Sequence, residues 1–273
     1  MNIAISQATT MAHSLEEDLE AFAKAQWPGL ELWITKIENY LKNHSVQHLK
    51  DLLDSYPIQK IAASYQGGIL QINQESQKLH LEQFRQRLEM CQALQIPLLT
   101  IIGDLSTNPG YIPQEKDSER FLLNLKQSAR WADSFGIRLG LEFRIRDPFC
   151  SCLETALSLV EACGEKNVGV VLDLFHFMNG PSKFSDLYQG DVNKIYLVQV
   201  CDMSSMPREF SRDSDRILPG DGNYPISELM QSLKDTGYQN WVSLELFNPV
   251  LAQMKASQVA ELGYMSLQRM LPK

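Results

Sequence analysis

The sequence predicts an α/β protein that folds as a closed (β/α)8 barrel. Strand-like and helix-like segments alternate along the whole chain, and eight such units of roughly 30 residues fit this architecture. The last four strand-like segments also carry one polar residue each within an otherwise apolar run. A chain of 273 residues has the length of one such barrel, so we expect a single domain over residues 1–273.

The alternative architecture is an open, doubly wound sheet. Such a sheet usually carries a Gly-rich phosphate-binding loop directly after its first strand. The segment that follows the first strand-like run here reads S-Q-A-T-T-M-A, which has no glycine. The closed barrel is therefore the favoured interpretation.

The first half of the chain supplies four strand–helix units. We expect Ser14 to open the first helix, because Glu17 three residues later completes a capping box. An amphipathic stretch follows the second strand as far as about Tyr56, and later helices are expected near 77–95 and 117–135. The four strands are expected at residues 3–7, 30–33, 60–64 and 98–102.

The second half continues the alternation, with helices expected at 153–163, 182–188, 225–236 and 251–270. Its strands lie in the segments RLGLEFR, VGVVLDLFHF, IYLVQVCD and WVSLELFN. Residues two apart in a strand share a face, so the polar residue of each segment can point the same way as the residue two before it. These pairs are Gly140 with Glu142, Val171 with Asp173, Leu197 with Gln199, and Ser243 with Glu245.

The four polar residues predict a metal site. Buried parallel strands are normally near-continuous apolar runs, and a buried carboxylate is costly unless it is paired, protonated or bound to a cation. Three carboxylates and one carboxamide form a hard, oxygen-rich set that suits Mn²⁺, Mg²⁺ or Co²⁺, with Zn²⁺ as a further option. Four separately satisfied buried polar groups are the alternative. The expected ligands are Glu142, Asp173, Gln199 and Glu245.

Charge and composition narrow the classes of partner. The net charge of -8 and the pI near 5.2 argue against a nucleic-acid or anionic-membrane surface. The chain shows no signal-peptide pattern and no apolar run of membrane-spanning length, so we expect a cytoplasmic protein. Its five cysteines are expected to be reduced thiols, although Cys150 and Cys152 leave a metal or redox pair open.

At these residues the chain resembles the xylose isomerase-like superfamily of sugar isomerases, epimerases and related dehydratases. The resemblance covers essentially the whole chain and implies a TIM barrel with one divalent metal, held by the four residues named above. Many members have His where this chain has Gln199, and Gln is found in some dehydratase-like members. The motifs that carry the resemblance are G-L-E-F-R, V-V-L-D-L-F-H, V-Q-V-C-D, R-I-L-P-G-D-G and S-L-E-L-F.

The resemblance also implies substrate-binding residues. His176 matches a substrate-contacting His of the family, and Arg216, before a Leu-Pro-Gly-Asp-Gly turn, resembles its substrate-binding Arg. A structural histidine and a solvated loop cation are the respective alternatives. Arg144 lies on the face of Glu142 and could clamp a substrate carboxylate or phosphate, or else pair with Asp147 or Asp202. In the second strand, Glu31 and Trp33 follow a pattern common in the family.

The chemistry implied is proton movement next to a carbonyl group. Glu142 and Glu245 could face opposite sides of a substrate carbon, one removing and one returning a proton through a metal-stabilised enediolate. This makes the protein a metal-dependent isomerase or epimerase of a sugar or sugar phosphate. If the enolate expelled a β-hydroxyl group, with His176 as the acid, the protein would be a dehydratase (lyase) of the 3-dehydroshikimate or inosose type.

There are two further candidate functions: a sugar-binding barrel, which stays open, and an endonuclease-type barrel, which the sequence disfavours. A non-catalytic sugar-binding barrel stays open if Gln199 weakens the metal. A related endonuclease-type barrel needs a three-metal cluster with several His at the strand ends, where His13, His44, His48 and His80 do not fall. The expected partner is therefore a small-molecule sugar, polyol or cyclic keto acid, and the sequence leaves a homodimer open.

Overall fold

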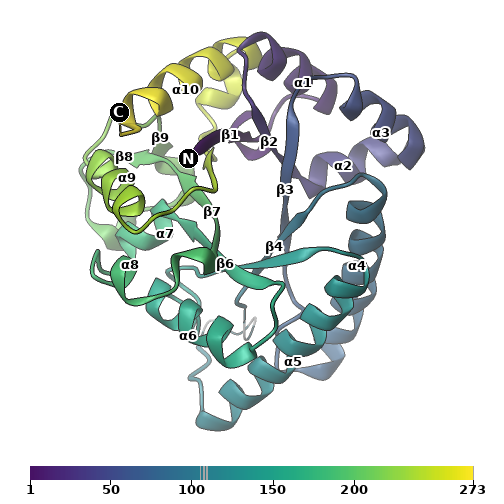
Figure 1. Cartoon of the computed structure of the whole chain (residues 1–273), viewed down its shortest axis with the longest axis vertical. Helices are drawn as coiled ribbons and strands as arrows, with labels where there is room; N and C mark the ends of the chain where they lie inside the picture. The colour runs from purple at the N-terminus through teal and green to yellow at the C-terminus, as the bar shows by residue number, and fades with distance from the viewer. Residues whose placement is uncertain (105, 107, 109, 273) are drawn as a thin grey trace. The chain divides into compact units, whose positions relative to one another are not determined.

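The computed structural model describes residues 1–104, 106, 108 and 110–272. Parallel strands form its central element. They are β1 (Asn2–Ser6), β2 (Gly29–Trp33), β3 (Gln59–Gln66), β4 (Leu98–Ile102), β5 (Arg138–Glu142), β6 (Val168–Asp173), β7 (Ile195–Val200) and β10 (Trp241–Leu244). They follow the order β1-β10-β7-β6-β5-β4-β3-β2 in a closed barrel, which confirms the predicted (β/α)8 architecture (Figure 1).

Helices follow the strands along the chain. They are α1 (Leu15–Lys24), α2 (Ile34–Leu41), α3 (Val46–Asp54), α4 (Gln74–Ala93), α5 (Glu115–Ser134), α6 (Leu153–Cys163), α7 (Leu174–Asn179), α8 (Asp186–Gln189), α9 (Ile226–Asp235) and α10 (Ala256–Met270). None of the described helices combines the length and the apolar character that crossing a membrane requires. By its internal contacts the chain divides into two compact units, one of residues 63–196 and one of residues 1–62 with the chain from Leu197 onward.

The first helix begins where the capping box predicts. The Ser14 hydroxyl accepts a hydrogen bond from the Glu17 backbone N–H at 3.2 Å, and the Glu17 carboxylate accepts one from the Ser14 N–H at 2.8 Å. The amphipathic stretch expected up to Tyr56 is two helices, α2 and α3. The break occurs because Ser45 caps α3, its hydroxyl accepting from the His48 N–H at 3.1 Å.

The C-terminal helix α10 packs against α1 and against β10, the last strand of the barrel. The Trp27 indole N–H donates to the Ala260 carbonyl at 3.0 Å, beside α1, and α10 packs against α1 (Figure 1). A side chain at Gly263 would place its Cβ 2.4 Å from Leu244, so the small residue lets α10 approach β10 closely. This close packing fixes the strand that leads into Glu245. Helix α10 itself begins at Ala256, later than the expected residue 251.

Two small elements were not expected from the sequence. Helix α7 starts directly after β6. A short antiparallel pair, β8 (Asp202–Met203) and β9 (Arg216–Ile217), sets Met203 opposite Arg216. Both elements lie beside residues expected to form the site, and both place side chains there.

The cysteines do not form disulfides: all five are free thiols. Cys150 is fully buried, and burial raises the pKa of its thiol well above the usual range. A neutral buried thiol is a poor metal ligand and a poor nucleophile, which argues against a functional pair with Cys152.

A candidate metal centre and the groups around it

In the unit of residues 63–196, the neighbouring strands β5 and β6 end side by side. Glu142 is the last residue of β5 and Asp173 the last of β6, and in the pairing of these strands Glu142 lies opposite Val171. Asp173 therefore shares the face of Val171, two residues further along, as the alternation predicts. Both side chains are buried, with 7% and 0% of their surface exposed.

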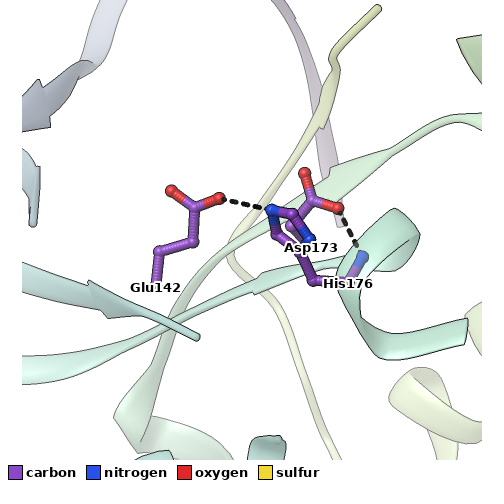
Figure 2. A group of neighbouring side chains, drawn as sticks. All are labelled: Glu142, Asp173 and His176. Atoms are coloured by element: carbon purple, nitrogen blue, oxygen red, sulfur yellow. Dashed lines mark hydrogen bonds and ion pairs between the residues drawn. The ribbon is translucent and has the colours of Figure 1, made fainter. Parts of the chain in front are cut away.

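Asp173 also determines where His176 lies. Its carboxylate caps α7 by accepting a hydrogen bond from the His176 backbone N–H at 3.1 Å. The helix turns the imidazole toward β5, where its Nε2 lies 3.6 Å from Oε1 of Glu142. Figure 2 shows the three side chains pointing toward one another. One ligand atom from each lies within 4.8 Å of the others, so the group could hold a metal ion.

Arg144 follows β5 and forms an ion pair with a neighbouring loop residue. Its guanidinium donates to both oxygens of Asp147, at 3.0 and 3.2 Å, so Asp147 is a partner of this arginine, as the sequence allowed. Burial lowers the pKa of Arg144, but the hydrogen bond to Asp147 together with the charges of Asp147, Glu142 and Asp104 raises it overall. The side chain stays 31% exposed, so a role in binding substrate remains a prediction.

Asp104, just after β4, is a partly buried carboxylate in the same unit. It accepts hydrogen bonds from the Gly68 N–H at 2.9 and 3.1 Å, which fixes the loop after β3. Burial raises its pKa to about 6, while the Gly68 hydrogen bond and the charge of Arg144 act in the opposite direction. The sequence did not single out this residue.

The other unit gathers a second set of side chains. Gln199 lies opposite Ser243 in the pairing of β7 with β10, and Glu245 follows directly after β10. The Glu245 backbone N–H still donates to the Val200 carbonyl at 3.0 Å, so the ladder continues to this residue. The Gln199 amide nitrogen donates to Glu245 Oε1 at 3.0 Å and to Glu31 Oε1 at 2.7 Å.

The amide oxygen of Gln199 provides a test of whether this set suits a metal. Gln199 is 1% exposed, and its Oε1 has no hydrogen-bond partner among the described residues. A buried acceptor without a partner is unfavourable, and native structures rarely leave one. An amide oxygen is a good ligand for a hard divalent cation, so the residues present fit the expected ion.

Arg216 is buried, contrary to the alternative of a solvated loop cation. It is 1% exposed, and its guanidinium donates to Glu245 Oε2 at 3.2 Å and to Asp213 Oδ1 at 2.6 Å. Its guanidinium carbon also lies 5.3 Å from the centre of the Phe247 ring. The arginine therefore orients Glu245, and its expected contact with substrate remains a prediction.

Asp202 holds the turn that follows Arg216. Its carboxylate accepts hydrogen bonds from the backbone N–H groups of Gly220, Gly222 and Tyr224 at 2.9 to 3.0 Å. A Cβ at Gly222 would lie 2.4 Å from Asp202 Oδ1, so only glycine allows this approach. Asp202 thus stabilises the R-I-L-P-G-D-G segment and, through the β8–β9 pair, the position of Arg216.

Glu31 and Ser6 are the residues that the sequence reasoning undervalued. Glu31 is fully buried beside Gln199. Its signals in the sequence were a carboxylate in the apolar segment L-E-L-W and the resemblance to a second-strand pattern of the family. Ser6, opposite Glu31 in the pairing of β1 with β2, donates to Glu245 Oε1 at 3.5 Å. A serine at a strand end carries no recognisable signal of this kind.

Comparisons with known proteins give this site a context. Residues 19–267 match the family described as xylose isomerase-like TIM barrel. The chain is 32% identical over 263 residues to an inosose isomerase of Halalkalibacterium halodurans, covering 94% of this chain and 92% of that protein. A crystal structure of IOLI protein with a bound zinc atom superposes with a TM-score of 0.93 at 25% identity, covering 99% of this chain and 98% of that one.

A more distant relative is also informative. The chain is 25% identical to a 3-dehydroshikimate dehydratase of Pseudomonas aeruginosa, over 88% of this chain. It spans only 37% of that longer protein. This relative shows that sequences similar to this chain occur in a protein named for a dehydratase reaction.

Proposed function

Because the chain belongs to the xylose isomerase-like TIM barrel family, we propose that it is a divalent-metal-dependent isomerase or epimerase of a polyhydroxylated cyclic ketone of the inosose type. The observation that carries the proposal is the buried group of Glu142, Asp173 and His176, in which one ligand atom from each lies within 4.8 Å of the others. We take its two carboxylates as metal ligands and His176 as the neighbouring group that contacts substrate. Similarity to an inosose isomerase supports the substrate class.

We propose that Glu142, Asp173, Gln199 and Glu245 hold one metal ion. Three carboxylates and an amide oxygen favour Mn²⁺, Mg²⁺ or Co²⁺, and the related zinc-containing structure keeps Zn²⁺ among the candidates. The buried Gln199 Oε1 without a partner among the described residues supports the fourth ligand. When bound, the ion would supply positive charge that stabilises the charge developing on a substrate carbonyl oxygen.

The protein's own groups would then move the proton. Glu142 and Glu245 form the acid–base pair, one removing a proton next to the carbonyl and the other returning it. His176 Nε2, 3.6 Å from Glu142, can exchange a proton with that carboxylate or donate to a substrate oxygen. Arg216 keeps Glu245 oriented, and Arg144 and Arg216 are the proposed cationic contacts for substrate oxygens.

A dehydratase is the second candidate, and the residue at position 199 favours it. Gln199 offers an oxygen where, by the resemblance stated above, many members offer a His nitrogen and some dehydratase-like members carry Gln; a 3-dehydroshikimate dehydratase is also among the relatives. Arg144 would then bind a substrate carboxylate. Proton abstraction by Glu142 would be followed by loss of a β-hydroxyl as water, with His176 as the acid.

One assay separates these functions. Chelator-treated protein is reloaded with Mn²⁺ and incubated with inososes, ketoses and dehydroshikimate, and products are followed by NMR and mass spectrometry. An isomer of unchanged mass, formed from an inosose, is the expected result. A conjugated product lighter by one water would establish the dehydratase instead. Metal binding without any turnover would favour a binding protein, and an active chelator-treated sample would contradict both enzymes.

The assay has a matched control on the protein side. Glu142→Gln removes a proposed ligand and base, whereas Glu154→Gln makes the same chemical change at an exposed position at the start of α6. We expect the first variant to be inactive and the second to match the wild type. Equal activity of the two variants would remove Glu142 from the mechanism.

A further inference from the structure

The hydrogen bond between Glu31 and Gln199 crosses the interior of the barrel. Glu31 belongs to β2 and Gln199 to β7, and in the strand order β1 and β10 lie between them. The Gln199 Nε2 is nevertheless 2.7 Å from Glu31 Oε1. Side chains of strands that are not neighbours meet only by pointing inward, so both residues face the interior.

This contact fixes which way the Gln199 amide points. A carboxylate only accepts hydrogen bonds, while the amide nitrogen has two N–H groups to donate. Glu31 accepts one and Glu245 the other, at 2.7 and 3.0 Å. Turning the amide over would set its oxygen against two carboxylate oxygens, which would repel it. The nitrogen is therefore held toward the carboxylates and the oxygen away from them.

This arrangement leaves the amide oxygen of Gln199 buried. Gln199 Oε1 is buried and finds no hydrogen-bond donor in the part of the chain that the structure describes. A buried acceptor of this kind is suited to a cation. The network thus fixes the amide so that its oxygen, and not its N–H groups, is available to a cation.

We propose that Glu31 is a positioning residue for the metal site, which makes Gln199 an oxygen ligand by holding its amide nitrogen. The inference rests on the proposed function, because it takes Gln199 as a ligand. The same carboxylate can accept the N–H of an imidazole, so it would also orient a histidine at position 199, as carboxylates commonly do for metal-bound histidines.

The test compares two substitutions by their effect on metal affinity. Glu31→Leu removes the acceptor, while Glu31→Gln keeps an oxygen that can accept from the Gln199 amide. Chelator-treated proteins are titrated with Mn²⁺ in a calorimeter, and their melting temperatures are measured without metal. We expect Glu31→Leu to bind Mn²⁺ roughly 10–100-fold more weakly, as for other partners of metal ligands, and Glu31→Gln to keep most of the affinity.

Two further variants make the result specific. Asp18→Asn alters another buried carboxylate of the same unit, paired with Lys36, and should lower the melting temperature without changing Mn²⁺ affinity. In the Gln199→Leu background, Glu31→Leu should cost little further affinity, because the group it positions is gone. Independent, additive losses would mean that Glu31 acts by some other route and would overturn the inference.

The outcomes separate this inference from the proposed function. If the wild type binds no Mn²⁺, Mg²⁺, Co²⁺ or Zn²⁺, the proposed metal enzyme fails. If the wild type binds Mn²⁺ and Glu31→Leu binds it equally well, the positioning role of Glu31 is wrong while the metal site stands. If Glu31→Gln is as weak as Glu31→Leu, the charge of Glu31 matters rather than its hydrogen bond, which also overturns the inference.

Discussion

Arg216 and Glu245 form a buried ion pair, with Nη1 3.2 Å from Oε2 and side chains that are 1% and 5% exposed. The arginine comes from the short β9 strand and the carboxylate from the end of β10, so two separate loops are joined at this point. A buried pair is held in one geometry, and breaking it leaves an uncompensated charge.

Replacing Arg216 with Met should therefore destabilise the metal-free protein by roughly 3–5 kcal/mol, because Glu245 loses its counter-charge. Added Mn²⁺ should raise the melting temperature of this variant more than that of the wild type, since a bound cation supplies charge at Glu245. Differential scanning calorimetry with and without metal measures both effects. Arg208→Met, at an exposed position, is the control and should change neither quantity. An Arg216→Met protein as stable as the wild type would contradict the role given to this pair.

Asp173 caps α7 and is a proposed metal ligand, and different substitutions can separate the two roles. Asp173→Asn keeps an oxygen that can cap α7 but removes a proposed metal ligand of negative charge, so Mn²⁺ affinity should fall while stability changes little. Asp173→Ala should lose the metal as well, and the lost cap should cost about 0.5–2 kcal/mol more. Urea unfolding of metal-free samples and Mn²⁺ titration give the two readouts. Equal stability of the Asn and Ala variants would show that the cap contributes nothing.

Metal binding should survive the replacement of Gln199 by His but not its replacement by Leu. Gln199→His should retain metal, because an imidazole nitrogen can replace the amide oxygen as a ligand and Glu31 can accept its N–H. Gln199→Leu should lose affinity, because it removes the amide oxygen. Metal content after dialysis, measured by elemental analysis, checks the pair. If both variants kept the metal content of the wild type, Gln199 would be a core residue and not a metal ligand.

The raised pKa of Asp104 predicts that the metal-free protein loses stability as the pH rises. Its pKa is raised to about 6 in the folded protein from 3.8 in the unfolded chain, so between these values the folded state holds more protons. The stability that comes from protonated Asp104 is fully present below pH 3.8 and is lost as the pH rises to about 6. Metal-free wild type should therefore lose stability relative to Asp104→Asn over this range in urea unfolding. A difference that does not vary with pH would show that Asp104 does not titrate there.

The sequence predicted the strands well because their signal is local. Each barrel strand is an apolar run, and the alternation around Glu142, Asp173, Gln199 and Glu245 correctly placed all four residues at or near strand ends. The split between α2 and α3 was missed because amphipathic periodicity continues across Ser45, whose capping role depends on one hydrogen bond.

The rest depended on contacts between residues far apart in the chain. The β8–β9 pair depends on the way Asp202 holds the turn at Gly220, 18 residues away. Helix α7 is the exception: its cap, from Asp173 to the His176 N–H, is local, but six residues are too few to show a helical period. The burial of Arg216 and the importance of Glu31 depend on partners 29 and 168 residues away. Periodicity and composition carry no information on such pairs, so these features could be described only from the fold.

Hydrogen exchange at a substrate carbon is the decisive test of proton transfer by Glu142 and Glu245. Mn²⁺-loaded protein is incubated with an inosose in deuterated water, and substrate and product are examined by mass spectrometry, with Glu142→Gln and Glu245→Gln as the inactive references. We expect an isomeric product that carries one deuterium from solvent, formed only by the metal-loaded wild type. A product isomerised without any deuterium, or the same exchange in both Gln variants, would contradict proton transfer by these two carboxylates.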